Sequence, residues 1–154
     1  MIAPAALTGE AFSSKIGPWS IQRKTGAMNA VEAPAANRAH DAAVLSRAVV
    51  RAARLLGLSQ RALAGILGIS EASASRLCAG RYVLSQERAK EWELAVLLVR
   101  VFRSLDALWG HGDAARAWLA GPNTALGAAP ADLLPTVAGL VRVVTYLDNA
   151  RGRL

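Results

Sequence analysis

The sequence predicts an all-α protein, and three observations carry this prediction. Of the 154 residues, 53% are hydrophobic but only 5% are aromatic, so alanine and leucine supply most of the apolar content, as in packed helices. Apolar residues recur at helical spacing in several stretches. Serine, glycine and proline stand at the ends of these stretches, where helices begin and end. We expect three regions, at residues 1–37, 38–105 and 106–154.

The first region, residues 1–37, is expected to be a mostly disordered arm. It contains three prolines, three glycines and many alanines without a sustained apolar period. A short helix, or docking of Phe12 and Trp19 elsewhere on the protein, is left open. Nothing in this region specifies a partner.

The second region begins and ends with long helices. The first, His40–Leu56, ends at Gly57, and its apolar face is expected to consist of Val44, Leu45, Ala48, Val49, Ala52 and Leu55. The other, Ser85–Leu105, is apolar nearly all round between Leu94 and Phe102. Such a helix must be covered from several sides, either at the centre of the protein or in a subunit interface.

Between these helices, residues 58–84 read as two short helices joined by a tight turn. Ser59 and Ser70 suit the N-cap positions, because a serine hydroxyl accepts a free backbone N–H of the first turn. Gly68 can adopt the positive φ that the turn requires, and Gly80 can end the second helix, Glu71–Ala79. Ala64 is small where the two helices cross. This is the helix-turn-helix pattern, with an ordinary pair of packed helices as the alternative.

In a helix-turn-helix protein the second helix enters the major groove of DNA. Here its outer face is expected to carry Glu71, Ser73, Ser75 and Arg76, pointing away from an Ala72–Leu77 side. Glutamine can pair with adenine and arginine with guanine. Glu71 would be repelled by phosphate, though it can accept from cytosine or favour the helix N-terminus. The expected DNA-binding residues are Ser59, Gln60, Ser70, Glu71, Ala72, Ser73, Ser75, Arg76 and Arg81.

The positive charge is concentrated in the same part of the chain. The net charge is +7, and residues 41–104 hold ten lysines and arginines against five acidic residues. Such a basic surface can bind phosphates, which supply most of the non-specific affinity for DNA; a solvated basic face is the alternative. The expected phosphate contacts are Arg47, Arg51, Arg54, Arg61, Arg76, Arg81, Arg88 and Lys90.

Several function classes are not expected. The single cysteine, Cys78, cannot form an intramolecular disulfide and falls short of a metal cluster. His40 and His111 lie outside any recognisable nucleophile–base spacing, and no glycine-rich phosphate loop is present, so neither catalysis nor a cofactor is expected. The longest apolar run, Leu94–Val99, is too short to span a bilayer, and no signal peptide is evident, so we expect a cytoplasmic protein without membrane contact.

The third region predicts shorter helices. Asp113 can cap a helix at Ala114–Ala120, which Gly121-Pro122 would end. Pro130 suits the first position of a helical turn, and Pro135 breaks or restarts the helix. The last helix is expected to bury a stripe of Val137, Leu140, Val141, Val144 and Leu147, leaving Arg142, Tyr146, Asn149 and Arg153 off the stripe and a mobile tip at Arg151–Leu154.

A family resemblance rests on a series of motif residues in this region. They are Ala117-Trp118-Leu119, Pro122-Asn123, Ala125-Leu126-Gly127, Pro130, Asp132-Leu133-Leu134, Thr136, Gly139, Val143, Leu147 and Gly152. In order and near spacing they resemble the C-terminal domain of the Xre/MbcA/ParS antitoxins, and the upstream helix-turn-helix is similar to the family arrangement. Ala131, where the family usually has a larger aliphatic residue, and Pro135 depart from the pattern.

The resemblance implies an antitoxin of a type II toxin–antitoxin system. Its partner would be a RES-domain toxin that consumes NAD+ or transfers its ADP-ribose, and the C-terminal domain would bind that toxin and obstruct the NAD+ pocket. The family also tends to dimerise and to repress its own operon at operator DNA, so a homodimer within a toxin–antitoxin complex is expected. The expected toxin-binding residues are Trp118, Asn123, Asp132, Arg142, Tyr146, Asp148, Asn149, Arg151, Arg153 and Leu154.

Other interpretations stay open for these residues. Trp118 can be a core residue, and Asn123 and Asp132 can cap local turns. A pocket for an anionic dinucleotide should be electropositive, so Asp148 or the tip carboxylate could mimic phosphate, or the tip arginines could pair with acidic toxin residues. The alternative function is a free-standing repressor whose C-terminal domain dimerises or senses a ligand. An adjoining toxin gene would favour the antitoxin.

Overall fold

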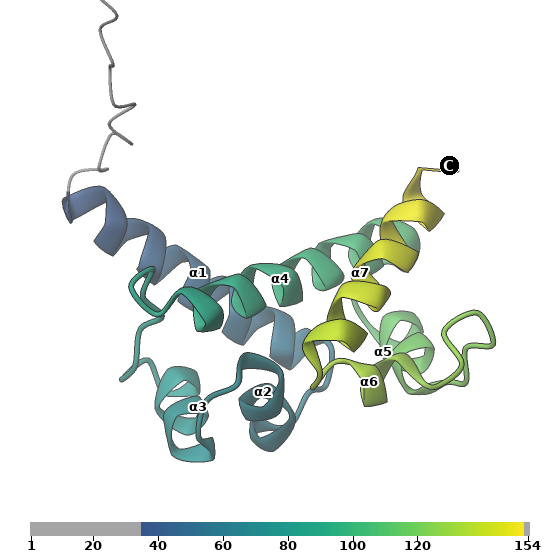
Figure 1. Ribbon diagram of the computed structural model, residues 1–154, viewed down its shortest axis with the longest axis horizontal. Helices are drawn as coiled ribbons and strands as arrows, with labels where there is room; N and C mark the ends of the chain where they lie inside the picture. Colours follow the sequence, from purple (N-terminus) through teal and green to yellow (C-terminus); the bar gives the residue numbers. More distant parts are fainter. Residues whose placement is uncertain (1–34, 153–154) are drawn as a thin grey trace, which may run out of the picture. The chain divides into compact units, whose positions relative to one another are not determined.

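The computed structural model describes residues 35–152, and the regular structure in this range is helical apart from one isolated bridge between Asn123 and Ala128. The described helices belong to one compact unit, Ala33–Leu154 (Figure 1). They are α1 (Ala35–Leu55), α2 (Gln60–Leu67), α3 (Glu71–Cys78), α4 (Ala89–Trp109), α5 (Asp113–Ala120), α6 (Pro130–Leu133) and α7 (Val137–Arg151). The all-α prediction is confirmed. Phe12, Trp19 and most of the expected arm, as well as Arg153 and Leu154, lie outside the described residues.

Helix α1 begins five residues earlier than expected, and its buried face agrees with the prediction at Val49 and Ala52 but not at Val44. Val44, predicted to be buried, is 43% exposed. Ala42 and Ser46 are buried beside the predicted Val49, and their small side chains allow α1 to pack closely against α4. The buried Ser46 hydroxyl donates to Ala42 O (2.7 Å) and accepts from Leu84 N (2.9 Å), so it is fully satisfied.

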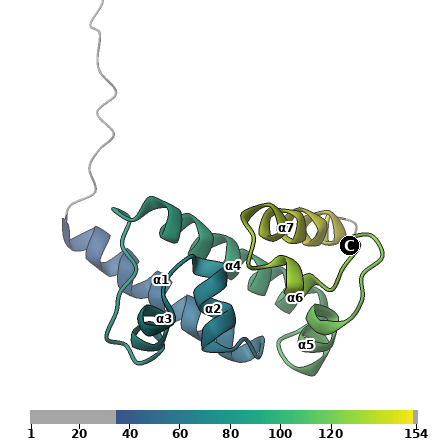
Figure 2. The same cartoon turned by 60° about the horizontal axis from the view of Figure 1, so that its bottom comes forward.

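The helix-turn-helix forms as the sequence predicts. Ser59 Oγ accepts from Ala62 N and Ser70 Oγ accepts from Ser73 N, each at 3.1 Å, so both predicted N-caps are confirmed. Gly68 adopts a left-handed conformation (φ +65°) in the turn. Ala64 is buried between the crossing helices. Figure 2 shows α2 and α3 beside α1, toward one end of α4.

Helix α4 starts four residues later than predicted, because the side chain of Arg88 holds the preceding segment in a turn. Arg88 Nη2 donates to Val83 O (2.7 Å), and Arg88 Nε donates to Glu91 Oε2 (2.8 Å). From Ala89, α4 continues to Trp109 and contacts α1, α2, α5 and α7. Of the two predicted environments for this helix, a central position is the one that the structure shows.

The C-terminal helices begin and end close to the predicted residues. Asp113 is the first residue of α5 and pairs with Arg116; it is not the cap, which is Gly112. Pro130 occupies the first turn of α6, as predicted. Thr136, directly after Pro135, caps α7 by accepting from Gly139 N (3.1 Å).

The predicted apolar stripe of α7 is wrong in two positions. Val137 and Val141 are 51% and 44% exposed, whereas Leu140, Val144 and Leu147 are buried, joined by Val143. This difference between the predicted and the observed buried face of α7 follows from Gly139, which lies directly against the carbonyl oxygen of Leu133 in α6. Because this contact turns the Leu140 side of α7 toward α4, the other side faces solvent.

Replacing Gly139 with alanine should therefore destabilise the protein. The new Cβ would overlap the Leu133 carbonyl and lie 2.7 Å from Thr136 Oγ1, so α7 would have to shift. We expect Gly139→Ala to lower the free energy of unfolding by about 2–3 kcal/mol, measured by urea denaturation. The control is Gly65→Ala in α2, where the nearest atom is Pro135 Cβ at 3.7 Å. That change should leave stability unchanged or raise it by up to about 1 kcal/mol.

Candidate functional site

The outer face of α3 is the candidate DNA-reading surface. Ala74 and Leu77 are buried, whereas Glu71, Ala72 and Arg76 are exposed. Ala72 therefore lies on the outer side, which corrects the expectation that it faces the core with Leu77. The hydroxyls of Ser70 and Ser73 lie 3.0 Å apart at the helix start, and Arg76 Nη2 lies 3.5 Å from Ser73 Oγ. Ser59 and Ser70 act as caps, and Arg76 presents its guanidinium at the surface.

Glu71 has a cationic neighbour of its own. Its carboxylate lies 3.5 Å from Arg61 Nε, and both side chains are well exposed. A surface ion pair of this kind contributes little to stability. It does place a positive charge beside the acid that would otherwise repel phosphate. Glu71 also lies in the first turn of α3, where a negative charge is favoured by the helix dipole.

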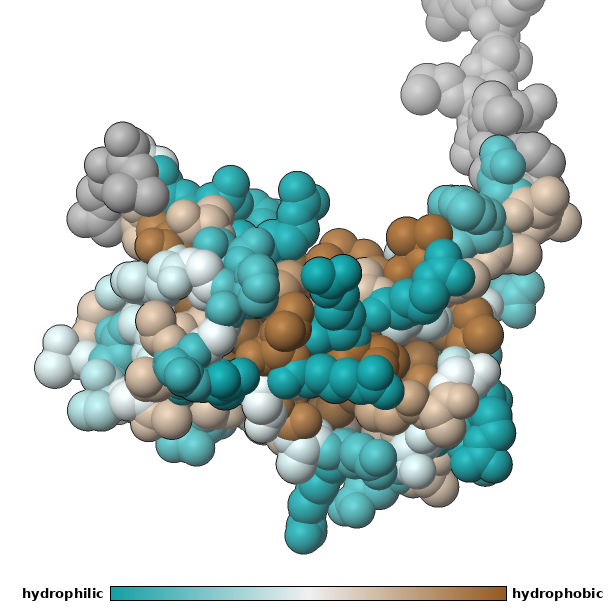
Figure 3. All heavy atoms as spheres, turned by 180° about the vertical axis from the view of Figure 1, so that it is seen from behind, coloured by the Kyte–Doolittle hydropathy of each residue, from teal (hydrophilic) through white to brown (hydrophobic). Residues whose placement is uncertain are grey.

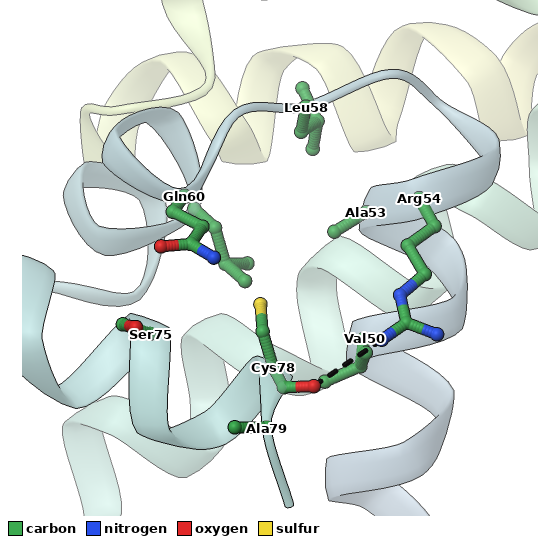
Figure 4. A pocket seen from close by; sticks show the side chains of 9 residues that line it. Val50, Ala53, Arg54, Leu58, Gln60, Ser75, Cys78 and Ala79 are labelled. Carbon is green, nitrogen blue, oxygen red and sulfur yellow. Dashed lines mark hydrogen bonds between the residues drawn. The ribbon is translucent and has the colours of Figure 1, made fainter.

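A hollow of about 330 Å³ lies between α1, α2 and α3 (Figure 4). Gln60 and Ser75, both expected to bind DNA, line it, and Cys78 points into it from α3. Arg54 Nη2 donates to Cys78 O (3.3 Å). The guanidinium of Arg54 therefore lies at the C-terminal end of α3, where a positive charge stabilises the helix dipole.

The basic residues expected at phosphates divide into two groups. Arg88 is committed to the turn before α4: besides its bonds to Val83 and Glu91, its guanidinium lies 5.0 Å from the Tyr82 ring centroid. The Glu91 hydrogen bond raises the pKa of Arg88, and burial, with Glu91, raises the pKa of Tyr82, whose hydroxyl donates to that carboxylate at 2.9 Å. The other seven are exposed, as Arg88 is: Arg47, Arg51, Arg54, Arg61, Arg76, Arg81 and Lys90.

A stack of three aromatic rings joins α4, α5 and α7 in the C-terminal half. Trp118 of α5 lies between Trp109 of α4 and Tyr146 of α7, with ring centroids 5.4 Å and 5.9 Å away. Trp118 and Tyr146 are half-buried, so both contribute to packing, whereas Trp109 is 44% exposed. Trp109 was not among the expected site residues. Its position directly before Gly110, at the end of an apolar helix, was the available signal.

The loop between α5 and α6 is held by residues that were expected to contact a partner. Asn123 Oδ1 accepts from Leu126 N (3.1 Å), so its side chain caps a local turn. Arg142 Nη2, from α7, donates to Leu126 O (2.8 Å) and ties the loop to that helix. Asp132 is exposed on α6. In this conformation Asn123 and Arg142 already have partners within the chain.

The C-terminal end of α7 is joined to α4 by polar contacts. Asp148 Oδ2 lies 2.6 Å from Arg100 Nη2, and the other oxygen lies 3.4 Å from Ser104 Oγ. Arg151 Nη1 lies 3.4 Å from the same hydroxyl. Two predicted site residues, Asp148 and Arg151, therefore meet at Ser104. Arg100, which was not among the expected site residues, joins this group. Asn149 is exposed on the same helix.

Within residues 35–152, six large hydrophobic side chains are exposed, and three of them lie in the C-terminal half. These three are Trp109, Val137 and Val141. Exposed apolar groups that lie together on a folded domain mark surfaces for binding. Val137 and Val141 are one helical turn apart, so they lie on the same side of α7.

The described residues contain no group of three or more metal-binding side chains. His40 is exposed on α1, and His111 Nδ1 lies 2.8 Å from Asp106 Oδ1 at the surface. None of the helices in residues 35–152 is long and apolar enough to cross a membrane.

Comparison with known families gives two matches. Residues 28–100 match the model of the antitoxin Xre-like helix-turn-helix domain. Residues 104–153 match the model of the antitoxin Xre/MbcA/ParS C-terminal toxin-binding domain. A search among curated proteins found no match to this chain. The two family matches confirm the resemblance that the motif residues indicated, and they meet within α4.

The aromatic stack gives a stability prediction. Replacing Trp118 with leucine removes both ring contacts, each worth about 0.5–1.5 kcal/mol beyond burial, whereas Trp109→Leu removes one contact from an exposed ring. We expect Trp118→Leu to lower the free energy of unfolding by about 2–4 kcal/mol and Trp109→Leu by about 1 kcal/mol, measured by urea denaturation. Equal losses would contradict a central role for Trp118.

Proposed function

The chain belongs to the Xre/MbcA/ParS family of antitoxins, and we propose that it neutralises a RES-domain toxin by closing the toxin's NAD+ pocket with the domain at residues 104–153. The toxin would consume NAD+ or transfer its ADP-ribose to a protein. We also propose that the helix-turn-helix binds operator DNA as part of a homodimer and represses the chain's own operon. We propose that the chain meets both the toxin and the operator DNA in the cytoplasm.

The observation that carries the toxin-binding proposal is the exposed apolar surface of the matched domain. Val137 and Val141 form a strip on α7, and Trp109 adds an exposed ring at the end of α4. A partner that covers these side chains stabilises the complex, since burial of apolar area drives most protein association. A partner can bind them without breaking a hydrogen bond or an ion pair between described residues.

Charged residues near the end of α7 are suited to the pocket itself. A site for a dinucleotide must attract phosphate, so an acidic side chain can compete for it. Asp148 is paired with Arg100, so phosphate mimicry by this carboxylate requires that ion pair to open. We therefore assign the main toxin contact to the valine strip of α7, and pocket closure to residues 148–154.

The DNA-binding proposal rests on the surface of α3 and on the charge around it. Arg76 and Ala72 lie on its exposed side, and Arg81 follows directly after Gly80. The surrounding surface arginines can neutralise phosphates and hold the helix in the major groove. A twofold dimer would place two copies of α3 on two half-sites.

The test of toxin neutralisation uses the purified product of the adjoining gene in an NAD+-consumption assay. The unmodified chain should abolish consumption, with NAD+ competing against inhibition because the two share a pocket. Val141→Asp should weaken inhibition about ten-fold or more, since it places a charge in the apolar contact. The matched control is Val44→Asp on α1, where the valine is 43% exposed, and it should inhibit normally.

Two results would contradict this proposal. If the neighbouring product keeps consuming NAD+ in the presence of the chain, and nothing co-purifies while the chain still binds its upstream DNA, a free-standing repressor is the better account. If inhibition occurs but does not depend on the NAD+ concentration, the toxin is neutralised away from its pocket.

The two proposed activities should be separable at Arg76. Arg76→Ala removes a guanidinium from the outer face of α3, so the affinity for operator DNA should fall about ten-fold or more at fixed salt, measured by fluorescence anisotropy. Inhibition of the toxin should be unchanged, because α3 lies outside residues 104–153. Loss of both activities together would show that they share one surface.

A further inference from the structure

A second surface hollow, of about 330 Å³, combines apolar and basic side chains from three helices. We refer to it as the arginine patch. It is lined by Leu45, Val96, Val99, Arg100, Arg103 and Arg151. Leu45 comes from α1 and Arg151 from α7, and the other four come from α4. Figure 3, which shows the molecule from behind, has apolar side chains crossed by hydrophilic ones over its middle.

The patch carries more positive charge than ion pairs within the fold neutralise. Arg100 pairs with Asp148, and Arg151 bonds to Ser104. Arg103 is exposed and makes no ion pair or hydrogen bond with the described residues. None of the residues that line the hollow is acidic. The patch therefore keeps a positive charge that no internal carboxylate neutralises.

The apolar part of the patch is also incompletely covered. Val96 is 45% exposed although it belongs to the central helix of the fold, and Leu45 and Val99 are half-buried beside it. Arginine stems can shield such a floor while their guanidinium groups stay in water. An apolar centre edged by arginines is the arrangement found in protein interfaces, where aromatic and arginine side chains dominate the binding energy.

We propose that the arginine patch binds an acidic segment of the cognate toxin that also carries an apolar side chain. This inference rests on the proposed function. Ser104, Asp148 and Arg151 belong to the matched toxin-binding domain, so the patch is continuous with it. The toxin interface would thus extend from α7 onto α4 and α1, beyond the residues that the domain match covers.

The same observations disfavour two other occupants. In a twofold contact centred on the patch, its arginines would face those of the other copy, in a chain with a net charge of +7. DNA phosphates would satisfy the guanidinium groups but would offer nothing apolar to Val96 and Leu45. An acidic protein segment matches both the charge and the floor.

The test measures binding of the adjoining gene's purified product by biolayer interferometry at two salt concentrations. Arg103→Glu should weaken the complex about ten-fold or more and reduce its salt dependence, because a reversed charge repels an acidic segment. Arg103→Lys, which keeps the charge, should bind within about three-fold of the unmodified chain. Val96→Asp should weaken binding, while Val83→Asp, at a matched exposure outside the patch, should not. Thermal unfolding of each variant establishes that it is folded.

The outcomes separate this inference from the proposed function. If Arg103→Glu and Val96→Asp bind the toxin as the unmodified chain does, the inference is overturned and the proposed function stands. If the unmodified chain does not bind at all, the proposed function fails and the inference fails with it. Weaker DNA binding or altered self-association in Arg103→Glu, with toxin affinity unchanged, would identify one of the other occupants and would also overturn it.

Discussion

The burial of α4 is the constraint on which the rest of the structure depends. Toward its start, Leu94 and Leu98 are covered by the helix-turn-helix half; further along, Val101 and Leu105 are fully buried as α5 and α7 join it. At 1.5 Å per residue, this helix of 21 residues is about 30 Å long, so it reaches through both halves. Neither half closes its core without it, which is why residues 33–154 form one compact unit.

Because α4 packs in both halves, the DNA-reading surface and the toxin-binding surface belong to one packed unit. The DNA-reading face of α3 belongs to the helix-turn-helix half, whereas the aromatic stack lies at the C-terminal end of α4. Gly65 of α2 also lies against Pro135, directly before the cap of α7. A partner on α7 and DNA on α3 would contact different helices of a single packed body, and the proposed separability of the two activities rests on this.

The parts of the fold that could be predicted from sequence are those decided within one turn of the chain. Ser59, Ser70 and Pro130 were placed correctly because capping and first-turn chemistry involve only nearby backbone groups. Apart from the starts of α1 and α4 and the cap of α5, the errors concern which face of a helix is covered. Val44 and Val141 fit an apolar period, but packing of α1 on α4 through small residues, and of α7 against Leu133 O, decides their exposure. Such contacts join residues that periodicity treats separately.

The same difference between local contacts and contacts between distant residues applies to the candidate site. Polar motif residues such as Asn123 and Arg142 look like contact residues in the sequence, yet their partners are the N–H and carbonyl of Leu126, which only the folded loop brings near. Their first role is to shape the domain. Side chains without an internal task, such as Val141 and Arg103, carry no motif signal, because nothing in their own segment distinguishes them from core or ordinary surface. The partner contacts proposed above therefore fall on residues outside the motif.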